Sequence, residues 1–153
     1  MKVFVTVGSG HFDQLIEQVD KLLLAPQFEV CCQIGIGEYK PHQSYFVFDD
    51  SYQHYVELAD VVVTHAGAGS VFELLEKGKK ILVVPNQYRI DQHQRDLAKY
   101  IAQHNYAQVC WQLEQLKALV ISTFDADFMP YQKDPFFKGD DLRRYFGLAI
   151  ADQ

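Results

Sequence analysis

The sequence indicates an α/β fold, a Rossmann-like parallel sheet with helices on both of its faces. Short apolar runs of the length of buried strands alternate along the chain with segments whose apolar residues recur every three or four positions. This alternation is typical of parallel sheets, because the crossover between two parallel strands usually contains a helix. The length of 153 residues and the 48% apolar composition suit a domain with a substantial core.

Each element is predicted from a local pattern. Residues 2–7 form a first apolar run, and the helix after it keeps apolar residues at helical spacing until Pro26 stops it. Ser51 is placed to cap a short helix, and Gly78 to end a longer one. The expected strands span residues 2–7, 28–34, 45–48, 60–64, 81–85 and 106–110, and the expected helices span residues 12–23, 51–58, 71–78, 91–104 and 113–120.

Residues 124–153 differ from the α/β part at residues 1–123. Five aromatic residues occur between Phe124 and Gly139 without a clear period, and Asp140 can cap a final helix with one apolar face. This tail either packs back onto its own sheet or offers an aromatic docking surface to another chain. Both interpretations stay open at this point.

Composition and charge exclude several classes of protein. A net charge of -6 and a pI near 5.4 argue against a nucleic-acid-binding protein, which needs a basic face. No apolar run approaches the ~20 residues that span a bilayer, so we expect a cytoplasmic protein with no transmembrane segment. The three cysteines form neither a CxxC pair nor a disulfide framework, and we expect them to be buried as small apolar residues.

The most informative stretch runs from Thr64 to Gln94. An apolar run ends in a turn of small residues, His65 to Ser70, which leads into a helix. Such a turn lets a ligand approach the main chain closely, and the start of a helix offers N–H groups and a partial positive charge to an anion such as phosphate. A second apolar run, Ile81 to Pro85, is followed by the polar tetrad Asp91 to Gln94. Both loops should lie at the same edge of the sheet, where open parallel sheets bind ligands.

These residues resemble a known family. His65-Ala66-Gly67-Ala68-Gly69-Ser70 with Glu73, Val83-Val84-Pro85-Asn86 and the tetrad are similar to the C-terminal half of glycosyltransferase family 28. Within it the chain resembles the small stand-alone subunits, such as the catalytic subunit of the dolichol-linked GlcNAc transferase and bacterial exopolysaccharide transferase subunits. Val7-Gly8-Ser9 and Phe12-Asp13 echo their first loop. The resemblance covers residues 1–110 and implies the fold of the C-terminal half of a GT-B glycosyltransferase.

The resemblance implies a UDP-sugar site. Main-chain N–H groups of the small-residue turn would receive the diphosphate, the carboxylate of Glu73 would accept hydrogen bonds from the ribose, and the loop from Phe48 to Ser51 would lie against uracil. The tetrad would contact the sugar, and the first loop would border the site with His11 as a candidate catalytic residue. The expected binding residues are Gly8, Ser9, Phe48, Ser51, His65, Gly67, Ala68, Gly69, Ser70, Glu73, Asp91, Gln92, His93 and Gln94.

Some of these residues have a simpler interpretation. Ser70 and Glu73 also fit a helix capping box, as do Asp91 and Gln94, and capping would explain their side chains without any ligand. His65 either contacts phosphate or orders the turn from within the core. A loop histidine such as His11 is usually only solvated.

The resemblance further implies inverting sugar transfer to a polyprenyl-linked acceptor without a metal or a cofactor. No HExxH motif and no cluster of Cys and His is visible in the sequence. The acceptor half of the enzyme would come from a separate membrane-bound partner subunit, which would hold the chain at the inner face of the membrane. The transferred sugar stays open among GlcNAc, galactose, glucose and glucuronic acid, the last because of Arg89 and Arg95.

Three other functions remain alternatives from the sequence. A UDP-sugar epimerase shares parts of the motif but has both domains in one chain. A non-catalytic nucleotide-sugar-binding module would use the same site without transfer. A flavodoxin-like or receiver-type signalling module has a similar length, but a receiver would carry an acidic cluster where this chain has Gly8-Ser9-Gly10-His11.

Overall fold

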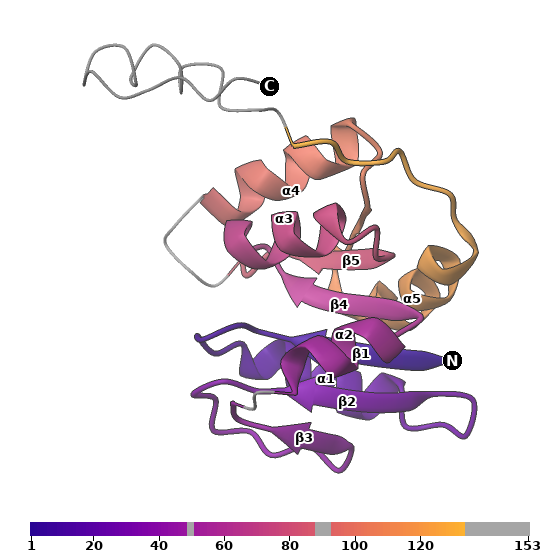
Figure 1. Ribbon diagram of the computed structural model, residues 1–153. Helices are drawn as coiled ribbons and strands as arrows, with labels where there is room; N and C mark the ends of the chain where they lie inside the picture. Colours follow the sequence, from indigo (N-terminus) through magenta and orange to yellow (C-terminus); the bar gives the residue numbers. More distant parts are fainter. Residues whose placement is uncertain (49–50, 88–92, 134–153) are drawn as a thin grey trace.

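A computed structural model describes residues 1–48, 51–87 and 93–133 (Figure 1). Its centre is one six-stranded sheet in the order β3-β2-β1-β4-β5-β6, and every neighbouring pair is parallel. This is the predicted Rossmann-like sheet. The strands are β1 (Lys2–Thr6), β2 (Glu29–Gln33), β3 (Ser44–Phe46), β4 (Val61–His65), β5 (Ile81–Val84) and β6 (Gln108–Val109).

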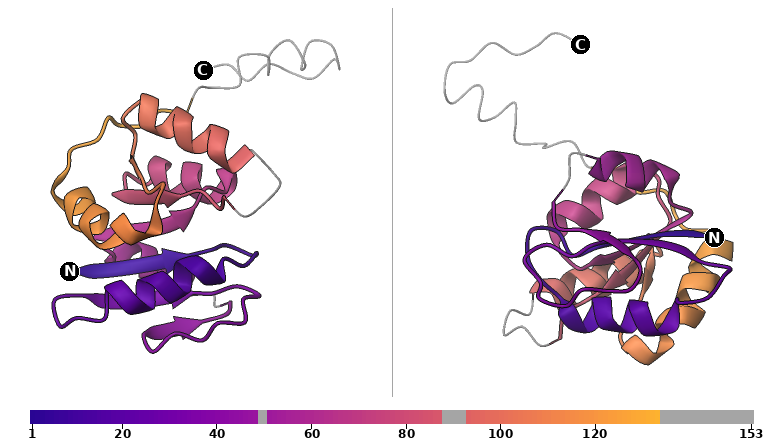
Figure 2. Two further views of the ribbon diagram at one scale, coloured as in Figure 1. Left: turned by 180° about the vertical axis from the view of Figure 1, so that it is seen from behind. Right: turned by 90° about the horizontal axis from the view of Figure 1, so that it is seen from below.

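Helices cover both faces of the sheet, as predicted. Helices α1 (Asp13–Leu22) and α5 (Leu116–Asp125) lie together along one side, which the right-hand view of Figure 2 shows most clearly. Helices α2 (Tyr52–Leu58), α3 (Ala68–Glu76) and α4 (His93–Gln103) pack on the opposite face. A short 3-10 turn, η1 (Leu113–Gln115), leads into α5.

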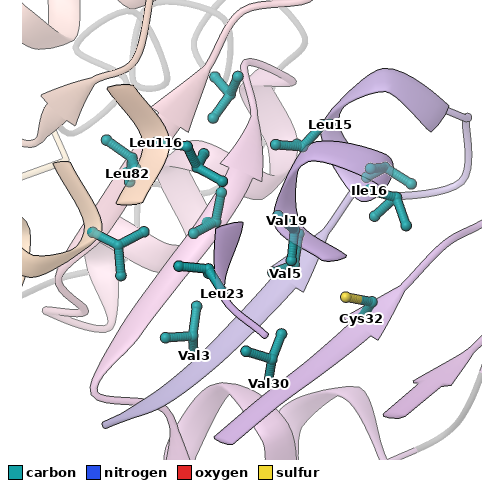
Figure 3. Packing of buried hydrophobic residues seen from close by; sticks show 14 of the residues in the cluster. Val3, Val5, Leu15, Ile16, Val19, Leu23, Val30, Cys32, Leu82 and Leu116 are labelled. Atoms are coloured by element: carbon teal, nitrogen blue, oxygen red, sulfur yellow. The ribbon is translucent and has the colours of Figure 1, made fainter. Parts of the chain in front are cut away.

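The core consists of two apolar layers, because successive residues of a strand point to opposite faces of the sheet. Val3 and Val5 of β1 join the layer under α1 and α5, whereas Phe4 between them joins the layer under α2, α3 and α4. The first layer is shown in Figure 3, where Leu15 and Val19 of α1 lie over β1 and β2. Because both faces of the central strands are buried in these two layers, the strands appear in the sequence as continuous apolar runs and not as alternating ones.

Two expected element boundaries need correction, and one expected helix lies outside the described residues. Helix α3 begins at Ala68 and not at Val71, since the turn is shorter than the run of small residues suggests. Helix α5 continues to Asp125, five residues beyond its predicted end at Val120. The helix expected after Asp140 falls outside the described part of the chain.

The segment after α5 folds back over α3 and α4. The N–H of Met129 donates a hydrogen bond to the carbonyl of Asn105 (2.8 Å), and the ring of Tyr131 contacts Phe72 and Tyr106, each with 5.3 Å between ring centroids. The start of the aromatic tail, up to residue 133, therefore packs against the α/β part of the chain.

Other expectations concern cysteines, membranes and metals. Cys32 and Cys110 are buried, which confirms the expected apolar role for these two, and Cys31 is partly buried. None of the three is in a disulfide. Within the described residues, no helix has both the length and the hydrophobicity needed to cross a bilayer. The same residues contain no group of three or more His, Cys, Asp or Glu side chains that could hold a metal ion.

Candidate functional site

The candidate site lies where the strand order reverses. From β1 the chain proceeds to β2 and β3 on one side, and the later strands β4 to β6 are added on the other side. The loops after β1 and β4 therefore lead to helices on opposite faces and leave a crevice between them, which is where open α/β sheets bind ligands. A pocket of about 250 Å³ occupies this position and is lined by Val7, Ser9, Gly10, His11, Phe12, His65, Asn86 and Gln94.

The charge of this pocket suits an anion. None of the described residues that line it carries a carboxylate, although the whole chain has a net charge of -6. Two of the lining side chains are the imidazoles of His11 and His65, and the others are apolar, hydroxyl or amide groups. The described lining of the pocket could therefore accept a phosphate without repulsion from a carboxylate, although the protein as a whole is acidic.

The start of α3 borders the crevice. Gly67 is its N-cap, and the first helical hydrogen bond runs from the N–H of Val71 to the carbonyl of Gly67 (3.0 Å). The N–H groups of Ala68, Gly69 and Ser70 precede that bond and belong to the helix start, where main-chain donors and the helix dipole favour an anion. Ala68 and Gly69 are exposed, and a Cβ at Gly69 would have no described atom within 4 Å. The main chain here is open to a ligand.

The first loop forms the opposite wall. Gly8 has a φ of +64°, a conformation that favours glycine, and its N–H donates a hydrogen bond to Thr6 Oγ1 at the end of β1 (3.2 Å). Ser9 and His11 are exposed beyond this turn. The N–H of Ile36, in the loop after β2, donates to the carbonyl of Gly10 (3.0 Å) and supports the first loop from behind.

Residues at the end of β5 and at the start of α4 form the third side of the pocket. Gln94 is buried at the start of α4, and its Oε1 accepts a hydrogen bond from the N–H of Asn86 (3.0 Å). This bond ties the first turn of α4 to the end of β5, while the neighbouring His93 is exposed. Asp91 and Gln92, the other two members of the tetrad, lie outside the described residues.

Glu73 faces α2 and not the start of its own helix. Its Oε1 accepts hydrogen bonds from Gln53 Nε2 (2.9 Å) and from Lys77 Nζ (2.6 Å). The bond from Lys77 has the largest effect on the pKa of Glu73, and together with the bond from Gln53 it lowers this pKa below its ordinary value of 4.5. The carboxylate is therefore ionised at neutral pH. The capping-box alternative for Ser70 and Glu73 is wrong, because the helix begins two residues before Ser70 and no side chain caps it.

Phe48 and Ser51 flank the loop expected to contact uracil, whose two central residues are outside the described part of the chain. Phe48 is 56% exposed, so it presents an aromatic surface just after β3. Ser51 is the N-cap of α2, and its carbonyl accepts a hydrogen bond from the N–H of Tyr55 (3.2 Å). The side chain of Ser51 makes no capping bond in α2, contrary to the capping expected from the sequence.

His65 is the last residue of β4 and lines the pocket. Its side chain is half-buried, with Nδ1 enclosed, and its ring lies against the main chain of both Gly8 and Gly67. The structure thus brings together His65, Gly67 to Ser70, Gly8, Ser9, His11 and Gln94 at one crevice, and places Glu73 farther along α3 toward α2.

Two neighbours of the site were not among the predicted binding residues. Asn86 lines the pocket directly after β5, and its place at a strand end was the signal that could have identified it. Gln53 holds Glu73, but no local pattern reveals that contact, because the two residues belong to different helices.

Comparison with known proteins agrees with this geometry. The sequence profile described as the glycosyltransferase family 28 C-terminal domain matches residues 2–135. The chain belongs to this family. The predicted resemblance is therefore confirmed, and it extends beyond residue 110.

Curated relatives of this family 28 chain include two kinds of protein. The UDP-N-acetylglucosamine transferase subunit ALG13 of Homo sapiens is 35% identical over 122 residues, which are 71% of this chain and 11% of that protein. The UDP-N-acetylglucosamine--N-acetylmuramyl-(pentapeptide) pyrophosphoryl-undecaprenol N-acetylglucosamine transferase of Christiangramia forsetii is 30% identical over 109 residues, 67% of this chain and 30% of that enzyme. The match thus spans a minor part of the length of either relative.

Solved structures share the fold of this family 28 chain. MurG of Acinetobacter baumannii superposes with a TM-score of 0.63 at 21% identity, over 79% of this chain and 40% of that one. The solution structure of ALG13 superposes with a TM-score of 0.60 at 19% identity, over 92% and 94% of the two chains. At these identities the likeness shows the fold alone, which is the predicted one.

Proposed function

We propose that this family 28 chain binds a UDP-sugar and is the donor-binding, catalytic subunit of an inverting glycosyltransferase. The observation that carries the proposal is the crevice between the loops after β1 and β4. There the open main chain at Ala68 and Gly69 starts a helix beside a pocket whose described lining has no carboxylate. A diphosphate fits this place, because main-chain N–H groups and a helix start stabilise negative charge.

Glu73 supports the assignment of the nucleoside. A carboxylate only accepts hydrogen bonds, which suits the two hydroxyls of a ribose. Both of its described bonds end on Oε1, and we propose that Oε2 accepts from the ribose. The uracil would then lie toward α2, against the loop that Phe48 and Ser51 flank, since α2 supplies the partner Gln53 on that side.

The chemistry follows from this placement. The acceptor hydroxyl oxygen attacks the anomeric carbon, the bond from that carbon to the phosphate oxygen breaks with inversion, and UDP leaves with the electron pair. Main-chain donors of the helix start would stabilise the developing charge on the leaving group, and we propose that this step needs no metal or cofactor. His11 is exposed at the rim of the pocket, and we propose its imidazole as the base that takes the acceptor proton.

The sugar would lie beside the loop after β5. His93 is exposed at the start of α4 and Gln94 lines the pocket, and we propose that both contact its hydroxyls. The family resemblance assigns Asp91 and Gln92, which lie outside the described residues, to the same sugar. UDP-GlcNAc is the first donor to test, because both kinds of curated relative are named as N-acetylglucosamine transferases.

A partner is part of the proposal. ALG13 is named a transferase subunit, and the described site of this chain provides groups for the donor. We propose that a membrane-bound partner subunit supplies the acceptor wall and a polyprenyl-linked acceptor for polysaccharide or glycolipid synthesis. The chain would then work at the cytoplasmic face of the membrane.

Calorimetry with UDP, UDP-GlcNAc, UDP-glucuronic acid and ADP tests the donor assignment. We expect UDP and one UDP-sugar to bind, and ADP to bind at least about tenfold more weakly, a difference of 1.4 kcal/mol. Equal binding of ADP and UDP, or no binding of either, would overturn the assignment. Specific binding that never leads to transfer with any membrane partner would instead support a nucleotide-sugar-binding module.

A further inference from the structure

The imidazole of His65 touches the two loops that form the crevice. A Cβ added to Gly8 would lie 2.9 Å from His65 Cε1, closer than real side chains approach. A Cβ added to Gly67 would collide with Nε2 of the same ring, and its other near neighbours are Cε1 at 2.9 Å and Cδ2 at 3.1 Å. One side chain thus occupies the space beside a glycine of the first loop and beside the N-cap glycine of α3.

The backbone of Gly67 does not itself require glycine. Its φ of -81° and ψ of 124° are extended values that any residue adopts. The three nearest atoms to an added Cβ all belong to His65, so the ring is what excludes a side chain here. Gly69, two residues later, has no described atom within 4 Å of an added Cβ, so its small size has a different cause.

The ring has little freedom to move away. His65 is the last paired residue of β4, in register with Val84 of β5, and its Nδ1 is buried. Its main chain is therefore held by the sheet and Nδ1 of its ring is enclosed, while Cε1 and Nε2 lie closest to Gly8 and Gly67. A group fixed in this way can set the distance between the two segments that it touches.

We propose that His65 is a positioning residue, a brace that sets the spacing between the loop after β1 and the start of α3. On this account Gly67 is glycine to admit the imidazole, and Gly69 is glycine to admit the ligand. The consequence for ligand binding rests on the proposed function, because the braced segments are the two walls assigned to the diphosphate. The brace itself is a property of the protein without ligand.

A double-mutant cycle on thermal stability tests the brace without any ligand. Gly67→Ala should lower the Tm by at least about 3 °C, because the new methyl group displaces a packed ring. In the background of His65→Ala the same substitution should change the Tm by less than about 1 °C, since nothing then opposes the methyl group. Gly69→Ala is the matched control, and its effect on the Tm should be the same with and without His65.

Affinities for UDP and UMP test the positioning role. His65→Ala should weaken UDP about tenfold and UMP less, because the brace acts on the walls around the diphosphate. Adding Gly67→Ala to His65→Ala should weaken UDP by a smaller factor than it does in the unaltered protein. A purely structural histidine would lower the Tm and leave the ratio of the UDP and UMP affinities unchanged.

The outcomes separate the two proposals. Additive Tm shifts for His65→Ala and Gly67→Ala would overturn the brace, whatever the ligand data show. Coupled Tm shifts with an unchanged ratio of UDP to UMP affinity would overturn the positioning role. If the unaltered protein binds no UDP, the proposed function and the positioning role fail together, and the Tm cycle still decides whether the brace exists.

Discussion

Gly69 and Gly78, which lie in and just after α3, have opposite properties. Gly69 is exposed beside the crevice in the first turn of the helix, and an added side chain there would meet no described atom. Gly78 follows the last turn with a φ of +66°, a conformation that L side chains rarely adopt. We therefore assign the first glycine to the proposed ligand and the second to the fold.

We predict that Gly69→Val abolishes UDP binding and leaves the free energy of unfolding within about 0.5 kcal/mol, because the valine projects into the ligand space. Gly78→Ala, just after the end of the same helix, is the control, and it should lower the stability by about 1 kcal/mol without changing UDP affinity. Calorimetry and denaturant unfolding measure the two effects. Normal UDP binding by Gly69→Val would remove the phosphate from this helix start.

The ion pair of Glu73 with Lys77 and its proposed contact with the ribose can be separated by mutation. Lys77 and Gln53 both donate to Oε1, and the ion pair with Lys77 is partly exposed, so it adds little to stability. We predict that Glu73→Gln weakens UDP about tenfold, because an amide nitrogen replaces an acceptor needed by the ribose. The free energy of unfolding of Glu73→Gln should differ from that of the unaltered protein by less than about 1 kcal/mol.

Lys77→Gln is the control for Glu73. It removes the same ion pair but leaves the carboxylate, so UDP affinity should stay close to that of the unaltered protein. A loss of UDP affinity in Lys77→Gln as large as that in Glu73→Gln would mean that the ion pair, and not the carboxylate, matters for binding.

The connection between β2 and β3 shows how one helix organises a loop. Instead of a helix of its own, the crossover runs along α1 and is held by two of its carboxylates. Asp13 Oδ2 accepts from the N–H of Glu38 (3.1 Å), and Asp20 accepts from the N–H groups of His42 (2.8 Å) and Gln43 (3.2 Å). Asp20 also accepts from the Tyr39 hydroxyl (3.0 Å) and contacts the His42 ring. These bonds fix the path that leads into β3 and on to Phe48.

Asp20 makes the stability of this loop depend on pH. Burial acts to raise the pKa of Asp20, but the hydrogen bonds from His42, Tyr39 and Gln43 together hold it below its ordinary value of 3.8. A depressed pKa in the folded state stabilises the protein above the unfolded pKa, and this contribution is lost as the pH falls through the folded value. The contribution of Asp20 is therefore present at neutral pH and disappears in acid.

We predict that Asp20→Asn lowers the free energy of unfolding at pH 7 by about 1–3 kcal/mol, since several partly buried hydrogen bonds lose their charged acceptor. The difference from the unaltered protein should shrink as the pH falls below 3.8. Denaturant unfolding across this range measures it. Glu17→Gln on the same helix, which removes only an exposed pair with Lys21, should have a small effect, and a pH-independent deficit in Asp20→Asn would contradict the account.

For the molecule as a whole, we expect the isolated chain to bind UDP but to transfer sugar only with its partner. UDP at a hundred times its Kd should stabilise the isolated chain by about 2.7 kcal/mol, whereas sugar transfer should require the membrane partner. An assay of UDP release with a polyprenyl-linked acceptor measures transfer by the chain, by the partner and by both. Full turnover by the isolated chain would contradict the two-component proposal.

His11→Gln in the complex should lower transfer about a hundredfold or more and leave UDP affinity unchanged.

Much of this structure was accessible from local patterns. The order of strands and helices follows from apolar periodicity, because each element must bury one or two faces against the sheet. The crevice could be located because the carboxyl ends of parallel strands share one edge, so the Gly67 turn and the loop after β5 had to meet there. The family motif then indicated which residues at this edge to assign to the proposed nucleotide-sugar.

Contacts between distant segments could not be derived in this way. The capping box at Ser70 and Glu73 was a sound local pattern, yet α3 starts at Ala68 and Glu73 turns to Gln53, twenty residues earlier in the chain. The different roles of Gly67 and Gly69 likewise depend on where the ring of His65 lies in the folded protein. Local sequence selects among backbone conformations, but packing between elements decides which side chain occupies the space beside them.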